Sequence, residues 1–202
     1  RHLKDVGQII GKRPGVKAFS SLSLLITQKG PVFFTDTFVS DNPTHEEIAE
    51  TADLAAQEIR RFGITPKAAL ISHSNFGSRN SESARKMRAA LELIRQRAPD
   101  LEVDGEMQAG SALSEALRKR AMPNSRLSGE ANLLVFPNLD SANISLGIVR
   151  TMMDALHVGP ILLGAAQPAH ILSTSVTSRG VVNMAALAVV EASHSDFATM
   201  PA

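Results

Sequence analysis

The chain alternates between short apolar runs, which predict strands, and longer segments whose apolar residues recur at helical spacing. The apolar and β-branched residues at 19–27 and 31–35 flank a Lys29-Gly30 turn and predict two neighbouring strands. Thr44 and Glu47 form a capping-box pattern that opens a helix, and Gly63 ends it. Further strands are expected at 67–72, 101–103, 133–136 and 160–163, and further helices at 81–97, 112–120, 142–156 and 179–192.

This alternation predicts an α/β fold, with a mostly parallel central sheet covered by helices on both faces as a three-layer sandwich. The 202 residues are 44% apolar, which is enough to bury a real core. Because the chain starts at Arg1 rather than at Met, we expect it to be a piece of a longer polypeptide.

Composition excludes several classes of protein. With 21 basic and 20 acidic residues the net charge is +1, which gives no general attraction to nucleic acid or to a membrane surface. No apolar run approaches the roughly 20 residues that span a bilayer. The absence of cysteine excludes disulfides, thiolate nucleophiles and cysteine-bound zinc, and it favours a cytoplasmic location.

Two apparent motifs carry little weight. Gly7 and Gly11-Lys12 are spaced too closely for a phosphate-binding P-loop and follow no strand, so a turn is the better interpretation. His45-Glu46-Glu47 lacks the second histidine of a zinc motif, and no GxGxxG dinucleotide fingerprint is present. We therefore expect no metal site and no cofactor in this region.

Three polar segments, at 72–78, 104–108 and 129–145, contain residues that follow apolar runs. In open α/β sheets, ligands bind beyond the carboxyl ends of the strands. The first segment provides the candidate ligand-binding residues Ser74, Asn75, Phe76, Gly77 and Ser78. Its hydroxyls and free N–H groups could hold an anion, or they could simply cap the following helix; Phe76 is either a ligand wall or core filler.

The other two segments leave more alternatives open. Asp104 and Glu106 suit acid/base chemistry only if their pKa values are perturbed, and capping a turn is an equally good interpretation of Asp104. Asn132 and Asn143 are candidates for ligand contact, although such side chains often only pin irregular backbone.

These segments resemble the phosphotransacetylase family, the phosphate acetyl/butyryl transferases. The resemblance covers nearly the whole chain. It rests on the segments SHSNFGS at 72–78, DGE at 104–106, GEANLLVFPNLDSAN at 129–143, GPILLG at 159–164 and PAHILS at 168–173. It implies the phosphotransacetylase-like fold, which is akin to isocitrate and isopropylmalate dehydrogenases. It also implies a main domain at 1–158 and a segment at 159–202 that returns to an incomplete second lobe.

The residues of these motifs are more similar to one branch of the family, the transferase-like carboxyl-terminal region of large bacterial NADP-dependent malic enzymes. Active transferases carry a lysine where this chain has Phe76, an arginine in place of Thr174 and an aspartate in place of Gly180. Ser173 is kept, Arg179 offers a replacement positive charge, and Gly110 stands where an aspartate is usual. Loss of a positioned acid/base group costs about 10²–10⁴-fold in rate, so we expect no catalytic residue here.

The resemblance therefore implies a regulatory module that binds acetyl-CoA or a related acyl phosphate at Ser173, Arg179 and the residues named above. Its expected partners are an upstream malic enzyme domain, which would hold NADP and a divalent metal, and further copies of the chain in at least a dimer. An active phosphate acetyltransferase and a purely architectural region remain the alternatives.

Overall fold

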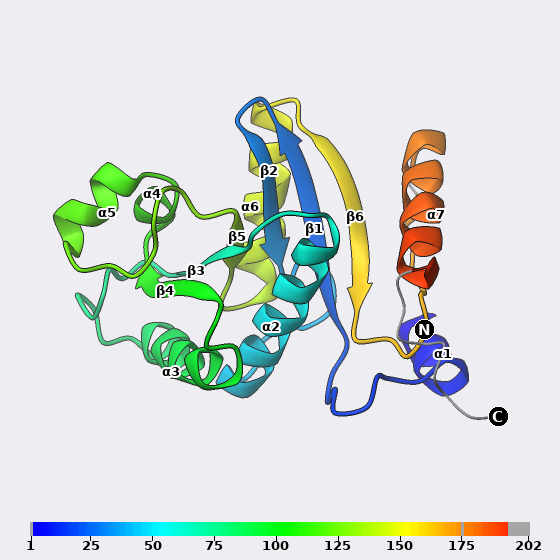
Figure 1. The fold of residues 1–202 in the computed structure, drawn as a ribbon, viewed down its shortest axis with the longest axis horizontal. Helices are drawn as coiled ribbons and strands as arrows, with labels where there is room; N and C mark the ends of the chain where they lie inside the picture. Colours follow the sequence, from blue (N-terminus) through cyan, green and yellow to red (C-terminus); the bar gives the residue numbers. More distant parts are fainter. Residues whose placement is uncertain (1, 175, 194–202) are drawn as a thin grey trace.

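The computed structural model describes residues 2–174 and 176–193 and contains a six-stranded sheet in the order β4-β3-β5-β2-β1-β6 (Figure 1). The strands are β1 (Ser20–Thr27), β2 (Gly30–Thr35), β3 (Lys67–Ile71), β4 (Glu102–Met107), β5 (Leu133–Val135) and β6 (Leu156–Leu163). The helices are α1 (His2–Ile9), α2 (His45–Arg61), α3 (Glu82–Arg97), α4 (Ala109–Ala112), α5 (Glu115–Ala121), α6 (Leu139–Met152) and α7 (Ser178–Ser193).

The sheet is mixed but mostly parallel, which confirms the predicted fold class. Strands β2, β5, β3 and β4 run parallel to one another. Strand β1 is antiparallel to both β2 and β6, and Thr27 and Gly30 are the last paired residues of β1 and β2 before the turn. The predicted Lys29-Gly30 turn therefore joins a hairpin, and the parallel strands place their carboxyl ends at one edge of the sheet.

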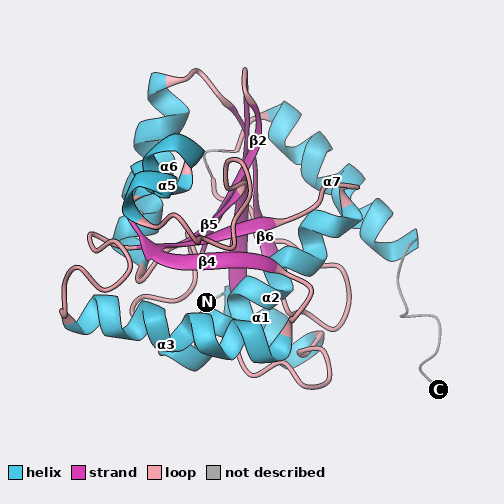
Figure 2. Cartoon of the chain, turned by 60° about the vertical axis from the view of Figure 1, so that its left-hand side comes forward, coloured by secondary structure: helices cyan, strands magenta, loops and turns pink. Residues whose placement is uncertain are grey.

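Helices cover both faces of the sheet, as expected for three layers (Figure 2). On one face, apolar residues of α2, α3 and α7 pack with Leu22, Phe33 and Leu70 of the sheet. On the other face, residues of α4 and α6 pack with Leu25, Phe34 and Leu134. The two fully buried aromatic residues Phe33 and Phe34 are adjacent in β2, so they contribute to opposite cores.

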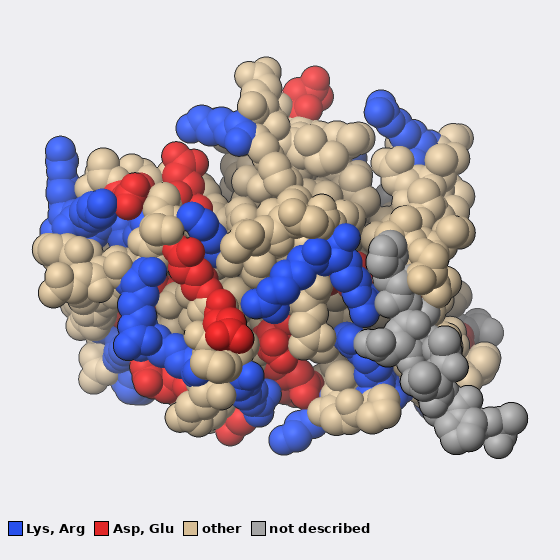
Figure 3. Space-filling model, in the orientation of Figure 1, with Lys and Arg blue, Asp and Glu red and all other residues tan. Residues whose placement is uncertain are grey.

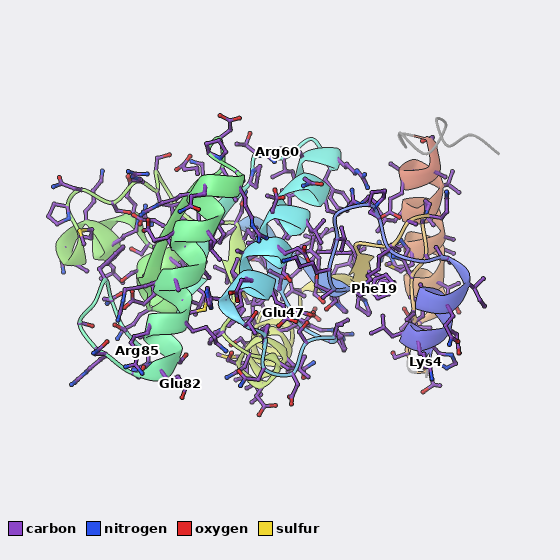
Figure 4. All side chains as sticks on the ribbon, turned by 90° about the horizontal axis from the view of Figure 1, so that it is seen from below. Lys4, Phe19, Glu47, Arg60, Glu82 and Arg85 are labelled. Carbon is purple, nitrogen blue, oxygen red and sulfur yellow. The ribbon has the colours of Figure 1, made fainter. Side chains whose placement is uncertain are left out.

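Helix α2 begins where the sequence predicts. Thr44 accepts a hydrogen bond from the Glu47 N–H, and the Glu47 carboxylate accepts one from the Thr44 N–H at 2.8 Å. This complete capping box satisfies donors that the first turn leaves free. Helices α2 and α3 lie side by side, and Glu47 and Arg60 mark opposite ends of α2 (Figure 4).

Several predicted boundaries are wrong. Strand β4 continues through Asp104 and Glu106, which the sequence analysis placed after a shorter strand. The single helix expected at 112–120 is two helices, because Ser114 caps a new helix after Ala112. The helix expected to reach 156 ends at Met152, and Leu156 instead opens β6, a longer strand than predicted.

Beyond β6, the two helices α1 and α7 form the outer end of the described chain (Figure 1). The expected division between 158 and 159 falls inside β6, so the chain leaves the sheet only after Leu163. Residues 1, 175 and 194–202 of the two expected domains lie outside the described part. Within that part, no helix is long and apolar enough to cross a membrane.

Candidate functional site

Polar segments follow the parallel strands β2, β3, β4 and β5 at the shared edge of the sheet. The loop after β3 is held by Glu106 of β4, which is fully buried. One oxygen of this carboxylate accepts hydrogen bonds from the Ser74 hydroxyl at 2.6 Å, from the Gly77 N–H at 2.9 Å and from Arg88 of α3 at 2.9 Å. Three donors on one oxygen stabilise the buried charge.

The rest of this loop is also used internally. The Asn75 N–H donates to the Ser78 hydroxyl at 2.9 Å, and the Asn75 side chain accepts from the Gln108 N–H at 2.8 Å. Phe76 packs against the core on the α4 and α6 side, with a positive φ of 47°. The structure thus brings all five candidates of this loop together, with the side chains of Ser74, Asn75 and Ser78 already bonded to the protein.

A second turn, after β2, is organised by Asp36, which is 6% exposed. Its carboxylate accepts hydrogen bonds from the N–H groups of Phe38 at 3.1 Å, Val39 at 3.2 Å and Ser40 at 2.9 Å. It also accepts from the Ser21 hydroxyl and from the Ser21 N–H at 3.1 Å. Asp36 therefore fixes the position of Phe38 and Val39 by charge-assisted hydrogen bonds.

Phe38 and Val39 belong to the wall of a pocket of about 530 Å³ between the outer strands and the segment before α7. This outer pocket is lined by His2, Leu3, Ser21, Phe38, Val39, Arg150, His157, Gly159, Pro160, Leu162, Ile171, Leu172, Ser173, Val176, Thr177 and Gly180. Its volume and its largely apolar wall, with a few polar groups, are typical of a small-molecule site.

Two side chains give the outer pocket its electrostatic character. Arg150, from the last turn of α6, brings a positive charge. Burial, and to a lesser degree the Arg150 charge, lowers the pKa of His157 to about 4, so its imidazole is neutral near pH 7. The His157 Nε2 atom is buried and has no hydrogen-bond partner in the described part of the chain. His157 thus brings to this wall a neutral ring whose Nε2 atom has its hydrogen-bonding capacity unused.

The remaining predicted site residues lie in different places. Ser173 lines the outer pocket, whereas Arg179 is exposed beside Gly180 in the first turn of α7. Asn143 of α6 donates to the Thr37 carbonyl at 3.1 Å, so it supports the turn after β2.

Asn132 lies at the opposite edge of the sheet and is not brought together with the other candidates. It precedes β5, where it accepts from the Lys67 N–H at 2.7 Å and donates to the Thr65 carbonyl at 2.9 Å. Its amide joins the amino ends of β3 and β5, far along the strands from the polar loops.

Asp104 is the second buried carboxylate of β4 and serves a neighbouring loop. It accepts from Arg95 of α3 at 3.2 Å, from the Ser125 hydroxyl at 2.7 Å and from the Arg126 N–H at 2.8 Å. Both oxygens of Asp104 therefore have donors, whereas all the donors to Glu106 meet one oxygen and its other oxygen is buried without a partner in the described part of the chain. Both carboxylates have a structural role in holding loops against β4.

The sequence analysis missed Ser21, Asp36, Arg150 and His157 as residues of the site. Asp36 had a usable signal, because it is a polar residue directly after a predicted strand. Arg150 and His157 had none, since Arg150 fell within the helix predicted at 142–156 and His157 directly followed it, where no strand was expected. Among the described residues there is no group of three or more side chains arranged to hold a metal ion.

The fold and these loops define a class of protein. The model of a family described as phosphate acetyl/butaryl transferase matches residues 1–189, and the chain belongs to that family. The structure is similar to a phosphotransacetylase from Streptococcus pyogenes, with a TM-score of 0.91 and 31% identity, over 96% of this chain and 59% of that one.

Particular relatives narrow the comparison. The chain is 75% identical over 194 residues to the NAD-dependent malic enzyme of Rhizobium meliloti (strain 1021), covering 96% of this chain and 25% of the relative. It is 48% identical over 192 residues to the NADP-dependent malic enzyme of Escherichia coli (strain K12), covering 95% and 25%. The chain thus spans about a quarter of the length of the malic enzymes that it matches.

Proposed function

We propose that this region is the phosphotransacetylase-like regulatory module of a malic enzyme and that it binds acetyl-CoA, or a related acyl phosphate, in the outer pocket. The family membership supports a site for a transferase's ligand, and the 75% and 48% identities to malic enzymes support the parent. Ser173 and Arg150 supply a hydroxyl and a cation for the anionic part of the ligand, and the apolar wall suits its uncharged part.

One observation carries the proposal that binding is not followed by transfer. No described residue that lines the outer pocket has a carboxylate, and Gly180 lines it at the position where the resemblance expects an aspartate. His157, with a pKa of about 4, is too weakly basic to accept a thiol proton efficiently near pH 7. Thr174 replaces the arginine that would stabilise charge on the acyl phosphate.

The similarity to malic enzymes supports a malic enzyme as the complete protein to which this chain belongs. A malic enzyme oxidatively decarboxylates malate, and its nicotinamide cofactor and divalent metal would bind upstream of this chain. The name of the 75% identical relative points to NAD, whereas the relative at 48% is named for NADP. We therefore extend our sequence-based expectation of NADP to either coenzyme, in a cytoplasmic enzyme.

Titration calorimetry with acetyl-CoA tests the binding site. The wild-type chain should bind, and Arg150→Gln should weaken binding by about tenfold or more, since a hydrogen bond to a charged group contributes about 1.5–3 kcal/mol. Lys29→Gln, in the hairpin turn and not among the residues that line the pocket, removes the same charge and should leave the affinity unchanged. Absence of binding at millimolar acetyl-CoA, in this chain and in the complete parent, would contradict the proposal.

The regulatory part is tested on the parent protein. Deleting this region should abolish any response of malate oxidation to acetyl-CoA, because the effector must bind two states of the enzyme differently. A purely architectural region would instead change the assembly size and leave the response intact.

An active phosphate acetyltransferase is the second candidate. The 31% identity to a phosphotransacetylase and the presence of Ser173 in the pocket favour it. Phosphate-dependent cleavage of acetyl-CoA by the purified protein would establish it.

A further inference from the structure

Ionisable side chains from separate segments meet beneath the carboxyl-terminal half of α7. Glu58 of α2 is 4% exposed and Glu191 of α7 is 7% exposed. His170, in the segment after β6, places its Nε2 atom 3.1 Å from a Glu191 oxygen. Its Nδ1 atom accepts a hydrogen bond from the Leu162 N–H at 3.2 Å, so the proton of a neutral ring lies on Nε2, the atom near Glu191, although Nε2 makes no hydrogen bond within the described residues.

The cations around this cluster come from two further directions. Arg61 of α2 donates to one Glu58 oxygen at 3.0 Å, and the other Glu58 oxygen is buried without a partner. Arg13, in the segment after α1, completes the wall of a cavity of about 20 Å³ together with Glu58, Arg61 and Glu191. Asp53, five residues before Glu58 on α2, also acts electrostatically on Arg13. The cavity has room for about one water molecule.

The cluster connects two parts of the outer pocket's wall, the segment 171–173 and the first turn of α7, to helix α2. His170 directly precedes Ile171, Leu172 and Ser173, which line the outer pocket. Glu191 is on α7, whose first turn contributes Gly180 to the same wall. Glu58 is on α2, which packs on the central sheet. Loosening this cluster therefore removes one attachment that α7 and the segment before it share, beside the core packing of α7.

We propose that Glu58, His170 and Glu191 form a proton-linked latch that fastens α7 to α2 and thereby positions the wall of the outer pocket. When Glu58 and Glu191 share one proton, only one of the two carboxylates is negatively charged, and α7 stays docked on α2. When that proton leaves, two buried carboxylates repel each other across the cavity, and undocking α7 relieves the repulsion because Glu191 leaves with it.

The direction of the pH effect follows from Glu58. Burial first, and the neighbouring Glu191 second, raise the pKa of Glu58 above its ordinary value of 4.5, against a smaller opposing effect of Arg61 and His170. A carboxyl group whose folded pKa is raised binds its proton more tightly in the docked state. Its contribution to docking is complete below about pH 4.5 and is lost as the pH rises through the folded value.

Hydrogen exchange measured by mass spectrometry on peptides from residues 178–193 tests the latch on the free protein. After correction for the intrinsic exchange rate, the opening constant of α7 should increase from pH 4.5 to 8. The limiting slope is about tenfold per pH unit, which corresponds to one released proton. Glu58→Gln should flatten this dependence and protect α7 more strongly than the wild type above the transition. Glu130→Gln, an exposed carboxylate in a loop, removes the same charge and should keep the wild-type slope.

Two results would overturn the latch. One is wild-type protection of α7 that is constant, or rises, across this pH range. The other is an unchanged slope in Glu58→Gln, measured on protein whose circular dichroism shows a native fold. Glu191→Gln gives a second test, because removing the like charge that faces Glu58 should also reduce the slope.

The latch goes beyond the proposed function and can be separated from it, because α7 exchange is measured without a ligand. If the outer pocket binds acetyl-CoA, its affinity should fall in parallel with α7 protection as the pH rises, and it should not do so in Glu58→Gln. A pH-dependent α7 together with no acetyl-CoA binding would support the latch and contradict the proposed function.

Discussion

At the scale of single residues, most polar side chains at the strand ends hold the protein together and few are left for a ligand. Ser74 and Ser78 were predicted to line a site, yet their hydroxyls bond to the protein itself. His157 is different, because it lines the outer pocket and its buried Nε2 atom has no hydrogen-bond partner in the described part of the chain. The residue type alone could not distinguish these cases, since the distinction depends on which neighbours the fold brings within hydrogen-bond distance.

The partly buried imidazole of His157 has a consequence for stability. Its pKa is lowered from 6.5 to about 4, first by burial and then by Arg150, so the unfolded chain takes up a proton before the folded chain does. The stabilisation is complete above about pH 6.5 and is lost as the pH falls toward 4. In His157→Gln, the urea midpoint should therefore fall less between pH 7 and pH 5 than in the wild type. His45→Gln, at an exposed histidine, should behave like the wild type, and identical pH profiles for all three proteins would contradict this assignment.

The position of Asn132 could have been predicted from the sequence. This side chain precedes the predicted strand at 133–136, so it belongs at the amino end of β5, whereas ligands of open α/β sheets bind beyond the carboxyl ends. The structure confirms that position, with Asn132 bonded to Lys67 and Thr65. A stricter use of strand direction would have removed it from the candidates.

At the scale of elements, apolar periodicity predicted most strands and helices, and it failed where buried polar residues continue an element. Asp104 and Glu106 interrupt the apolar pattern, yet β4 runs through both because donors from α3 and from two loops surround their carboxylates. Likewise, the turn after Met152 is followed by β6 and not by more helix, because Leu156 and His157 pair with β1. These outcomes depend on tertiary partners that local periodicity does not contain.

Glu106 links three elements, so its replacement should loosen all of them. In Glu106→Gln, Arg88 loses its ion pair and the loop after β3 loses its shared acceptor, which should cost about 1–3 kcal/mol of unfolding free energy. Urea denaturation measures this loss, and hydrogen exchange should locate it in residues 72–78. Glu92→Gln on α3, whose side chain is 65% exposed, should cost less than 0.5 kcal/mol, as is usual for surface substitutions. Equal losses for the two variants would show that the Glu106 network contributes nothing special.

At the scale of the whole molecule, the charge is balanced, and some of the exposed apolar residues form a row on α6. Lysine and arginine side chains are interspersed with acidic ones over the face seen in Figure 3, in keeping with a net charge of +1. On α6, Ile144, Ile148 and Met152 are 59%, 53% and 81% exposed, and their spacing of four residues places them on one side of the helix. A row of this kind suits contact with another protein surface.

We expect this row to take part in self-association, in agreement with the oligomer predicted from the sequence. Sedimentation velocity of the wild type should then show at least a dimer at micromolar concentration, and Ile148→Lys should shift the distribution toward the monomer. Glu130→Lys, in an exposed loop away from α6, serves as the control for added charge. A monomeric wild type, or an Ile148→Lys variant with the wild-type mass, would exclude this role of α6.

The central claim is that the outer pocket holds a transferase's ligand and leaves it intact. Equilibrium dialysis against acetyl-CoA labelled separately in its acetyl and adenosine parts, with phosphate present, tests this claim most directly. We predict saturable binding in which the two labels stay in the ratio of the starting compound, both on the protein and in free solution. Transfer of the acetyl label into acetyl phosphate, or the absence of saturable binding of either label, would contradict the account.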